Sequence, residues 1–355
     1  MHVAFADSDQ LCMCYPAPPG DPGRQHVKAL NVAAMLTNLR SAGAQCVIVN
    51  GVLDPGGLAT ELMPDADVTI CRLRARGDEV ERRFVGKHGH QDDTEELLRE
   101  IREEVSLMDQ SSFADACVDT SDVPAADVAA LVRAACKEWP GFTGDLPGPA
   151  GQLASSGYPA VSGHVVLITG PTGVGKSTIG FRFYLSCLSA GLTAGYVDLG
   201  QLGFMQPADR SDPDNQRLKA RNMAAIWRNY EAAGAGQLVA VGAIGDRADL
   251  QLYAEELAGA DLTVVRLRAD RTELRQRIMS RGAGGSWTEP GDRLTGQSSR
   301  FLAHVADRAA RDAEARDRSE TGDLVIDTTG RSPDESADLI ADSVRWFASQ
   351  PSPAA

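Results

Sequence analysis

One short run of residues combines glycines, a lysine and a hydroxyl at a spacing that suits phosphate binding. It fits the pattern G-x-x-x-x-G-K-S and consists of Gly170, Pro171, Thr172, Gly173, Val174, Gly175, Lys176 and Ser177, followed by Thr178. The glycines let backbone N–H groups turn inward around phosphate oxygens, and the N-terminus of a following helix adds partial positive charge. Lys176 would reach the β- and γ-phosphates of ATP, and the Ser177 hydroxyl would bind Mg²⁺. We therefore expect residues 170–178 to bind a nucleotide.

The elements that must position this loop alternate between strands and helices, which predicts a mostly parallel sheet covered by helices. The amphipathic segments 215–233, 271–281 and 334–347 are the clearest predicted helices. Predicted strands cover residues 2–6, 46–50, 68–73, 116–119, 165–169, 193–198, 238–244, 262–267 and 324–327. The loop follows the strand 165–169, which is the context that the pattern requires.

The chain also repeats itself. Asp7 and its neighbours match the segment around Asp198, and VKALNVAAMLTNLRSAGA aligns with LKARNMAAIWRNYEAAGA. Further along, ADVTICRLRA aligns with ADLTVVRLRA, and CVDTS with VIDTT. Four ordered blocks predict a tandem duplication of one α/β unit; the alternative is two generic α/β stretches of similar composition.

The repeat divides the chain into three predicted parts. Residues 1–140 form a copy without the loop, 141–163 form a Gly/Pro/Ser-rich linker, and 164–350 form the copy with the loop. The first copy lacks the strand that would carry the loop. We expect either that the true polypeptide begins upstream of Met1, or that another segment fills the vacant place in a degenerate copy that serves dimerisation or regulation.

The phosphate pattern alone does not separate kinases, ATPases and GTPases. A GTPase would be expected to show an N-K-x-D-like segment, which is absent. Many ATPases place an acid at the end of the third strand, whereas LVAVGAI ends without one. These features disfavour both classes.

The second copy resembles the small P-loop kinases. The resemblance rests on ITGPTGVGKST, VDLGQLGF, LVAVGAIGDR, TVVRLRADRTELRQRIMSRG and VIDTTGRSPDESADLI. Gluconate kinases and adenylylsulfate kinases are most similar, and chloramphenicol phosphotransferase is more distant. The resemblance implies a P-loop NTPase kinase-like parallel α/β sheet of order 2-3-1-4-5, with helices on both faces, in two tandem copies.

By this resemblance, Asp198 is the candidate catalytic base or an outer partner of Mg²⁺, since it ends a strand at the ligand-binding edge of the sheet. The alternative is an aspartate that caps the following turn. Gln201 is a candidate for orienting the acceptor. Gly200 and Gln201 replace the Asp and Arg of the adenylylsulfate kinase pattern, so the acceptor is not identified.

Arginines complete the implied site. Arg277 and Arg281 resemble those that stabilise developing charge during phosphoryl transfer, and the alternative is a solvated face paired with Glu273. Arg331 resembles an adenine-stacking residue, and the alternative is a turn in which residues 332–334 cap the last helix. Residues 282–300 resemble a lid that carries Arg293 and Arg300.

Composition limits the remaining function classes. The chain of 355 residues has 35 basic and 49 acidic side chains, and its net charge of -14 disfavours a general nucleic-acid binder. No apolar stretch approaches the roughly 20 residues of a membrane span, which favours a cytoplasmic protein with reduced cysteines. We expect a kinase that transfers the γ-phosphoryl group of ATP to a small molecule. The alternative is a nucleotide-dependent switch or slow ATPase with a protein partner, and a homo-oligomer through the first copy is also possible.

Overall fold

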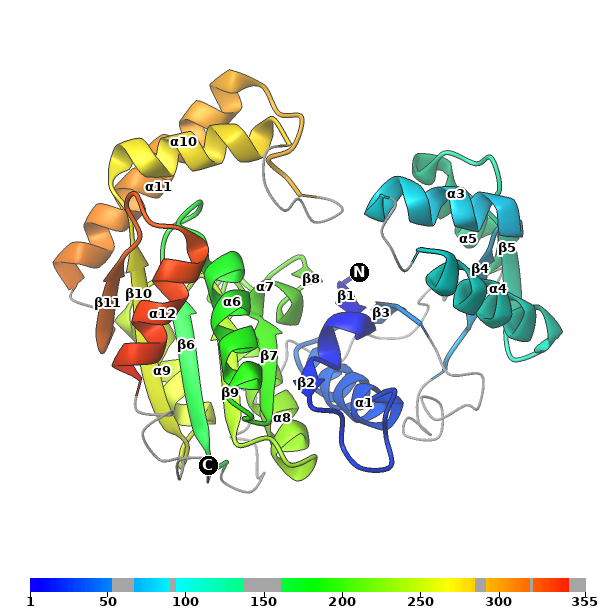
Figure 1. The fold of residues 1–355 in the computed structure, drawn as a ribbon, viewed down its shortest axis with the longest axis horizontal. Helices are drawn as coiled ribbons and strands as arrows, with labels where there is room; N and C mark the ends of the chain where they lie inside the picture. Colours follow the sequence, from blue (N-terminus) through cyan, green and yellow to red (C-terminus); the bar gives the residue numbers. More distant parts are fainter. Residues whose placement is uncertain (53–66, 90–93, 137–160, 285–291, 320–321, 345–355) are drawn as a thin grey trace. The chain divides into compact units, whose positions relative to one another are not determined.

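The computed structural model describes residues 1–52, 67–89, 94–136, 161–284, 292–319 and 322–344 (Figure 1). Contacts divide the chain into two compact units: Met1–Val52 with Gly148–Ala355, here the P-loop unit, and Leu53–Pro147, here the small unit. This division differs from the predicted domains 1–140 and 164–350, because residues 1–52 pack with the second half of the chain. Residues 141–160 of the predicted linker lie outside the described residues.

The P-loop unit is built on a six-stranded sheet. All neighbouring strands pair in parallel except the last, which pairs antiparallel. The central strand is apolar, and its residues 165–168 are fully buried, as expected for a parallel strand covered on both faces. In spatial order, the strands are β11 (Leu324–Asp327), β10 (Asp261–Arg268), β6 (His164–Thr169), β9 (Gln237–Val241), β7 (Ala194–Asp198) and β2 (Cys14–Tyr15).

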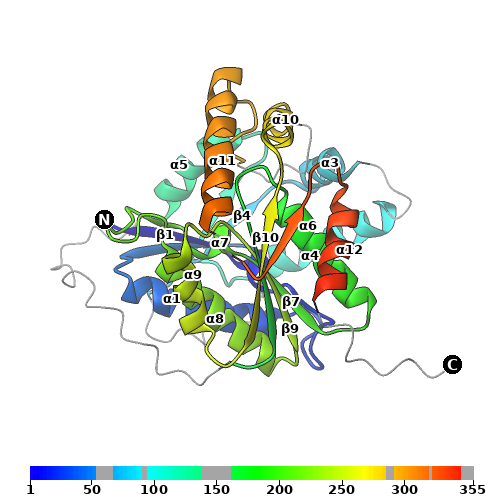
Figure 2. The ribbon, with the colours of Figure 1, turned by 90° about the vertical axis from the view of Figure 1, so that its left-hand side faces the viewer.

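Helices cover both faces of this sheet (Figure 2). One face carries α6 (Lys176–Ser189) and α12 (Pro333–Ser343), and the other carries α8 (Gln216–Ala232) and α9 (Arg247–Glu256). Trp227 and Tyr230 on α8 are completely buried, so they pack in the core. The last predicted helix ends at Ser343, and residues 345–347 lie outside the described part.

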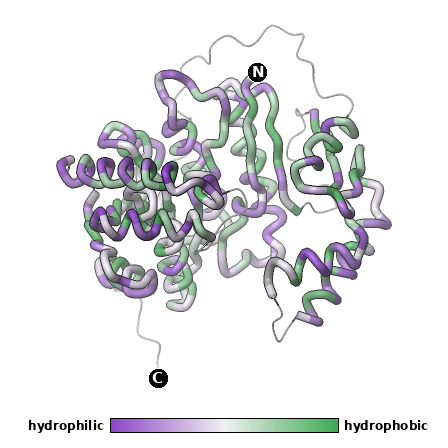
Figure 3. Tube along the Cα trace, turned by 90° about the horizontal axis from the view of Figure 1, so that it is seen from above, coloured by the Kyte–Doolittle hydropathy of each residue, from purple (hydrophilic) through white to green (hydrophobic). Residues whose placement is uncertain are grey.

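Two further helices extend beyond the loop edge of the sheet. α10 (Arg271–Gly282) and α11 (Ser299–Ser319) pack against each other around Ile278 and Leu302. In both helices, hydrophobic and hydrophilic residues alternate along the sequence, as in an amphipathic helix. Figure 3, coloured by hydropathy, shows the same alternation in helices of the chain. Of the predicted lid, residues 285–291 lie outside the described residues, and residues 292–298 form turns between these helices.

Residues 1–52 belong to the P-loop unit through an exchange of short strands. β1 (Val3–Asp7) pairs in parallel with β3 (Cys46–Asn50) and antiparallel with β8 (Met205–Gln206). In return, β2 pairs antiparallel with β7. The exchange is reciprocal, because Phe5 N donates to Phe204 O at 2.9 Å and Tyr196 N donates to Met13 O at 2.8 Å.

Two helices also join residues 1–52 to the second half of the chain. α1 (Gln25–Ser41) packs against α8, and two asparagine pairs join them. Asn38 Nδ2 donates to Asn222 Oδ1 at 3.0 Å, and Asn229 Nδ2 donates to Asn31 Oδ1 at 2.8 Å. The segment that follows β7, including α7 (Leu199–Leu202) and β8, is therefore held by residues 1–52.

The small unit is a second, separate α/β assembly. Its parallel strands β4 (Cys71–Arg74) and β5 (Ala116–Asp119) form a two-stranded sheet. Its helices are α3 (Gly77–His88), α4 (Thr94–Gln110) and α5 (Ala125–Ala135). The described strands of residues 1–140 thus lie in three sheets: β1 and β3 in one, β2 at the end of the six-stranded sheet, and β4 and β5 in the small unit. Within the described residues, no helix combines the length and apolarity needed to cross a membrane.

Candidate nucleotide-binding site

The glycine-rich loop lies where β6 ends, and α6 starts at Lys176. Its backbone φ is positive at all three glycines, Gly170, Gly173 and Gly175, a conformation that favours glycine. Gly170 has a φ of 153°, and a Cβ there would lie 2.6 Å from the carbonyl oxygen of Leu267. Gly175, with a φ of 100°, is the residue before α6. Ser177 and Thr178 occupy the first turn of the helix, so the loop forms the strand, turn and helix start that suit phosphate binding.

Lys176 folds back over this loop. Its Nζ donates to the carbonyl oxygens of Gly170 and Pro171, both at 3.0 Å. Burial, together with the nearby positive charge of Arg316, lowers the pKa of Lys176 to about 8. The ammonium lies among neutral carbonyls, near the cations Arg316 and Arg281 and the carboxylates Asp198 and Asp312. A bound phosphate would replace the water that burial removes from this ammonium.

Ser177 and Asp198 connect the loop to the end of β7. Ser177 Oγ donates to Asp198 Oδ2 at 2.9 Å, and Gly200 N donates to Asp198 Oδ1 at 2.8 Å. Asp198 is therefore both the cap of α7 and a neighbour of the loop. The capping interpretation is confirmed, and the catalytic one stays a prediction. A hydroxyl and a carboxylate are hard oxygen donors, and they fit Mg²⁺.

Arg277, on α10, is hydrogen-bonded to the glycine-rich loop. Its Nη1 donates to Val174 O at 3.0 Å and to Thr328 Oγ1 at 2.9 Å, while Nη2 donates to Thr328 O at 2.8 Å. Its Nε donates to Glu273 at 2.8 Å, the pairing expected for a helix face. In this arrangement the guanidinium positions the loop and is occupied by protein groups.

Two other arginines act electrostatically on Lys176. Arg281 pairs with the buried carboxylate of Asp292, and Arg316 on α11 pairs with Asp312 at 3.0 Å. Both charges lower the pKa of Lys176. The sequence reasoning missed Arg316. Its spacing places it on the same buried face of α11 as Leu302, Ala306 and Ala309. An arginine on a buried face is unusual, and this was the available signal.

Lys219 is a second cation that the sequence reasoning missed. Its side chain crosses Gly203, where an added Cβ would lie 2.6 Å from the lysine Cε. Burial lowers its pKa, whereas the negative charges of Asp198, Asp212, Asp214 and Asp249 oppose this effect. The signal was available in the repeat, because Lys28 occupies the matching position in the first copy and donates to Asp9 at 2.7 Å.

The remaining predicted residues lie around this centre. Gln201 is in α7, and Arg331 is exposed in the turn before α12, where Ser332 and Glu335 form a capping box. That capping of the last helix was one of the two interpretations of this turn, and it is confirmed. Arg293 and Arg300 are exposed, and no hydrogen bond or ion pair among the described residues joins them, or Arg331, to residues 170–177.

Comparison with known proteins gives structural likenesses alone. No protein-family model matches the chain, and no curated protein matches it. The APS kinase of Mycobacterium tuberculosis, in complex with AMPPNP and APS, is 18% identical over 52% of this chain and 98% of its own, with a TM-score of 0.33. A gluconokinase from Sinorhizobium meliloti is 16% identical over 54% of this chain and 100% of its own, with a TM-score of 0.32.

A third similar structure is the shikimate kinase of Acinetobacter baumannii in complex with shikimate. It is 16% identical over 51% of this chain and 92% of its own, with a TM-score of 0.33. At these values the likeness decides neither a reaction nor a substrate.

Proposed function

We propose that the P-loop unit is an ATP-dependent phosphotransferase that acts on a small-molecule acceptor. The observation that carries the proposal is the hydrogen bond of 2.9 Å between Ser177 Oγ and Asp198 Oδ2, beside the ammonium of Lys176. It brings a metal-binding hydroxyl, a carboxylate and a phosphate-binding cation to one edge of the sheet, the parts that phosphoryl transfer needs.

The proposed step breaks the bond between the γ-phosphorus of ATP and its bridging oxygen, and forms a bond from that phosphorus to an acceptor oxygen. The hydroxyl proton of the acceptor passes to a carboxylate oxygen of Asp198. Lys176 and the loop amides hold the phosphates, and the charges of Arg281 and Arg316 favour the transferred group. Mg²⁺, held by Ser177, would neutralise phosphate charge.

The acceptor side is the segment that follows Asp198. Lys219 lies there with a pKa lowered by burial, and residues 1–52 hold the same segment through β1 and β8. We infer that the acceptor contacts this segment. The ammonium of Lys219 favours an acceptor that carries a hydroxyl or an acidic group.

A second candidate is a nucleotide-dependent switch or slow ATPase without a small-molecule acceptor. The observation that favours it is the double engagement of Asp198, whose other oxygen caps α7. A nucleotide or metal that binds the Ser177 hydroxyl would break its hydrogen bond to Asp198 and so weaken the cap of α7. Because residues 1–52 contact the segment that contains α7, they would carry this change to a protein partner.

Release of ADP from Mg²⁺-ATP distinguishes these candidates. The purified protein is tested alone and with sugar acids, nucleosides and nucleoside monophosphates, beside Lys176→Ala and Asp198→Asn. Asp338→Asn, an exposed acid on α12, is the matched control. Acceptor-stimulated release that disappears in both variants and persists in the control supports the kinase. Release that no acceptor changes, but that still requires Lys176, supports the switch.

The tandem duplication is also a proposal, with copies at 1–140 and 164–350. It is supported by the reciprocal pairing of β1 with β8 and of β2 with β7, and by the two asparagine pairs between α1 and α8. Repeated hydrogen bonds between different residues of the same types are not expected of two unrelated α/β segments.

A further inference from the structure

Three of the seven cysteines lie together in the small unit. Cys71 is the first residue of β4, Cys117 lies in β5, and Cys136 is the residue at which α5 ends. Cys71 and Cys136 are half-buried, and Cys117 is exposed. A side-chain hydrogen bond joins Cys71 to Cys136, whereas Cys117 acts on Cys71 through its charge alone.

The register of the two strands explains why the pair is Cys71 with Cys136. Cys71 lies opposite Ala116, and Arg72 lies opposite Cys117. Successive side chains of a strand point to opposite faces, so Cys71 and Cys117 lie on opposite faces of the two-stranded sheet. α5 follows β5 along the chain and brings Cys136 to the thiol of Cys71. The cluster therefore contains one close pair of thiols and one neighbour outside it.

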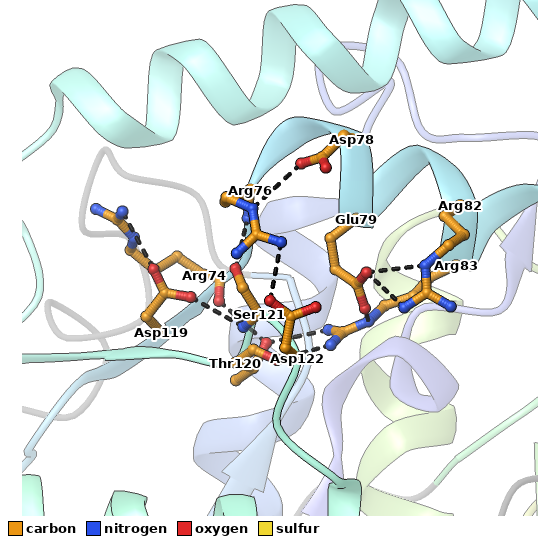
Figure 4. A network of polar contacts seen from close by, with 10 residues as sticks. All are labelled: Arg74, Arg76, Asp78, Glu79, Arg82, Arg83, Asp119, Thr120, Ser121 and Asp122. Carbon is orange, nitrogen blue, oxygen red and sulfur yellow. Dashed lines mark hydrogen bonds and ion pairs between the residues drawn. The ribbon is translucent and has the colours of Figure 1, made fainter.

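The rest of the small unit is held at the opposite ends of its strands. There Arg83 on α3 donates from Nη1 to Thr120 Oγ1 at 3.0 Å and from Nη2 to Thr120 O at 2.7 Å, and Thr120 Oγ1 donates to Arg74 O at 3.0 Å (Figure 4). α5 takes no part in this network. Among the described residues, no side-chain hydrogen bond or ion pair joins residues 125–135 to either strand, and α5 buries none of its residues. The thiol pair therefore lies where the helix is weakly attached.

The acidity of the thiols assigns their roles. Cys14 and Cys187 lie in the P-loop unit, where burial raises their pKa to about 11 and about 12, so they stay protonated. Burial and the neighbouring thiols, Cys136 first, raise the pKa of Cys71 to about 11. Cys71 therefore keeps its proton as the donor of the hydrogen bond, which leaves Cys136 as the attacking thiol of the pair.

We propose that Cys71 and Cys136 form a reversible disulfide, a modification site that ties the end of α5 to the start of β4. The oxidant is a hydroperoxide, with hydrogen peroxide as the simplest. The sulfur of Cys136 attacks one peroxide oxygen, the O–O bond breaks, and the released hydroxide takes up the proton that Cys136 has lost. The sulfur of Cys71 then attacks that of Cys136. An S–S bond forms, the S–O bond breaks, and the hydroxyl leaves as water with the proton of Cys71.

The electrons balance in this reaction. Two thiols lose two electrons and two protons, and these reduce one hydrogen peroxide to two waters. The bond encloses residues 72–135, so it limits the freedom of the unfolded small unit and fixes the end of α5. The proposal does not depend on phosphoryl transfer, because neither sulfur belongs to the nucleotide site.

Thiol counting and disulfide mapping on the full chain test the proposal. The reduced protein is treated with a small excess of hydrogen peroxide and alkylated with N-ethylmaleimide in urea. We expect the number of alkylated cysteines to fall by two from seven, and to return to seven after dithiothreitol. Digestion should give one linked pair of peptides, with Cys71 and Cys136; trypsin cleaves after Arg133 and so separates Cys136 from Cys117. Seven alkylated cysteines, another linked pair, or a bond between two chains overturns the proposal.

Variants test the assigned roles. Cys71→Ser should stop the reaction at the sulfenic acid of Cys136, which a cyclic 1,3-diketone traps, and Cys136→Ser should leave Cys71 as a thiol. Cys117→Ser, in the neighbouring strand, is the matched control and should form the bond as the unchanged chain does. Circular dichroism verifies that each variant is folded. A bond lost in Cys117→Ser would place Cys117 in the pair and contradict the assignment.

Hydrogen exchange tests the structural effect of the bond. The amides of residues 125–135 should exchange at least about tenfold more slowly in the oxidised protein than in the reduced one, because the bond fixes the end of the helix. The amides of α6, in the P-loop unit, should not change. Equal exchange of α5 in both forms would show that the bond does not tie this helix, against the proposal.

Discussion

At the scale of single residues, the titration of Lys176 gives the first prediction. Its pKa is about 8 in the free protein because the side chain is buried, and bound phosphates should raise it. Nucleotide binding then takes up a proton above pH 8, so the affinity for ATP should fall by up to about tenfold per pH unit as the pH rises through this range. Titration with a fluorescent nucleotide between pH 7 and 9.5 measures the slope.

The same shift predicts the pH dependence of stability without nucleotide. The unfolded lysine titrates near 10.5 and the folded one near 8, so the unfolded chain binds more protons between these values. The contribution of Lys176 therefore becomes more favourable as the pH rises from 8 to 10.5. Urea unfolding of the protein and Lys176→Met should show this rise only in the former; equal slopes would contradict it.

The hydrogen bond between Thr328 and Arg277 gives a prediction about how the glycine-rich loop is positioned. Thr328→Val removes the hydroxyl that accepts from Arg277 Nη1 and keeps the shape of the side chain. The same hydroxyl also donates to Arg268 O at 3.1 Å. The loss of the hydrogen bond to the charged group alone, about 1.5–3 kcal/mol, should weaken ATP binding by roughly ten- to a hundredfold if the loop depends on Arg277. Calorimetric titration measures it, with Thr272→Val, at an exposed position on α10, as control. An unchanged affinity would show that Arg277 does not position the loop.

At the scale of elements, the asparagine pairs between α1 and α8 give a prediction about residues 1–52. Asn222 is fully buried, accepts from Asn38 and donates to Leu202 O at 2.7 Å. Asn222→Leu leaves the amide of Asn38 and the carbonyl of Leu202 unpaired, which should lower the free energy of unfolding by about 2–6 kcal/mol, since each buried unpaired group costs about 1–3 kcal/mol. Urea denaturation is compared with Thr37→Ala, an exposed position on α1. A loss below about 0.5 kcal/mol would mean that this contact does not hold the helices together.

The longer elements could be predicted from sequence because their apolar runs have a clear period. β3, β5 and β11 have the bounds expected, α8 is one residue shorter than predicted at each end, and α10 is one residue longer at its C-terminal end. β2 and β8 were missed, since strands of two residues have no period, and their pairing joins segments far apart in the chain. That pairing is also why the compact units do not follow the repeat.

The candidate site was partly predictable for a similar reason. Residues 170–177 form a local pattern whose spacing alone defines a strand, turn and helix start. Arg316 lowers the pKa of Lys176, and Lys219 lies within electrostatic reach of Asp198. Both residues come from helices that are distant in sequence from the loop, so no local pattern predicts these positions. Sequence also left open whether Arg277 contacts Glu273 or the phosphate site; the structure has it bonded to Glu273 and to the loop itself.

At the scale of the whole molecule, residues 1–52 give a prediction about activity. They hold the segment after Asp198 through β1 and β8, so a change there should affect the acceptor more than ATP. Phe5→Pro removes the N–H that bonds to Phe204 O, and we expect a several-fold rise in the KM for the acceptor with little change for ATP. Circular dichroism verifies that the variant is folded. The control is Phe301→Ala, at an exposed position on α11. An equal rise in both KM values would contradict a role confined to the acceptor side.

The transfer of the γ-phosphoryl group itself tests the central claim most directly. ATP labelled with heavy oxygen on its γ-phosphate is incubated with the protein, Mg²⁺ and a small-molecule extract of the source cells, and the products are followed by mass spectrometry. We predict that the label appears in a phosphorylated small molecule, and that Lys176→Ala and Asp198→Asn abolish it. Label that appears only in inorganic phosphate, at a rate that the extract does not change, would contradict a kinase.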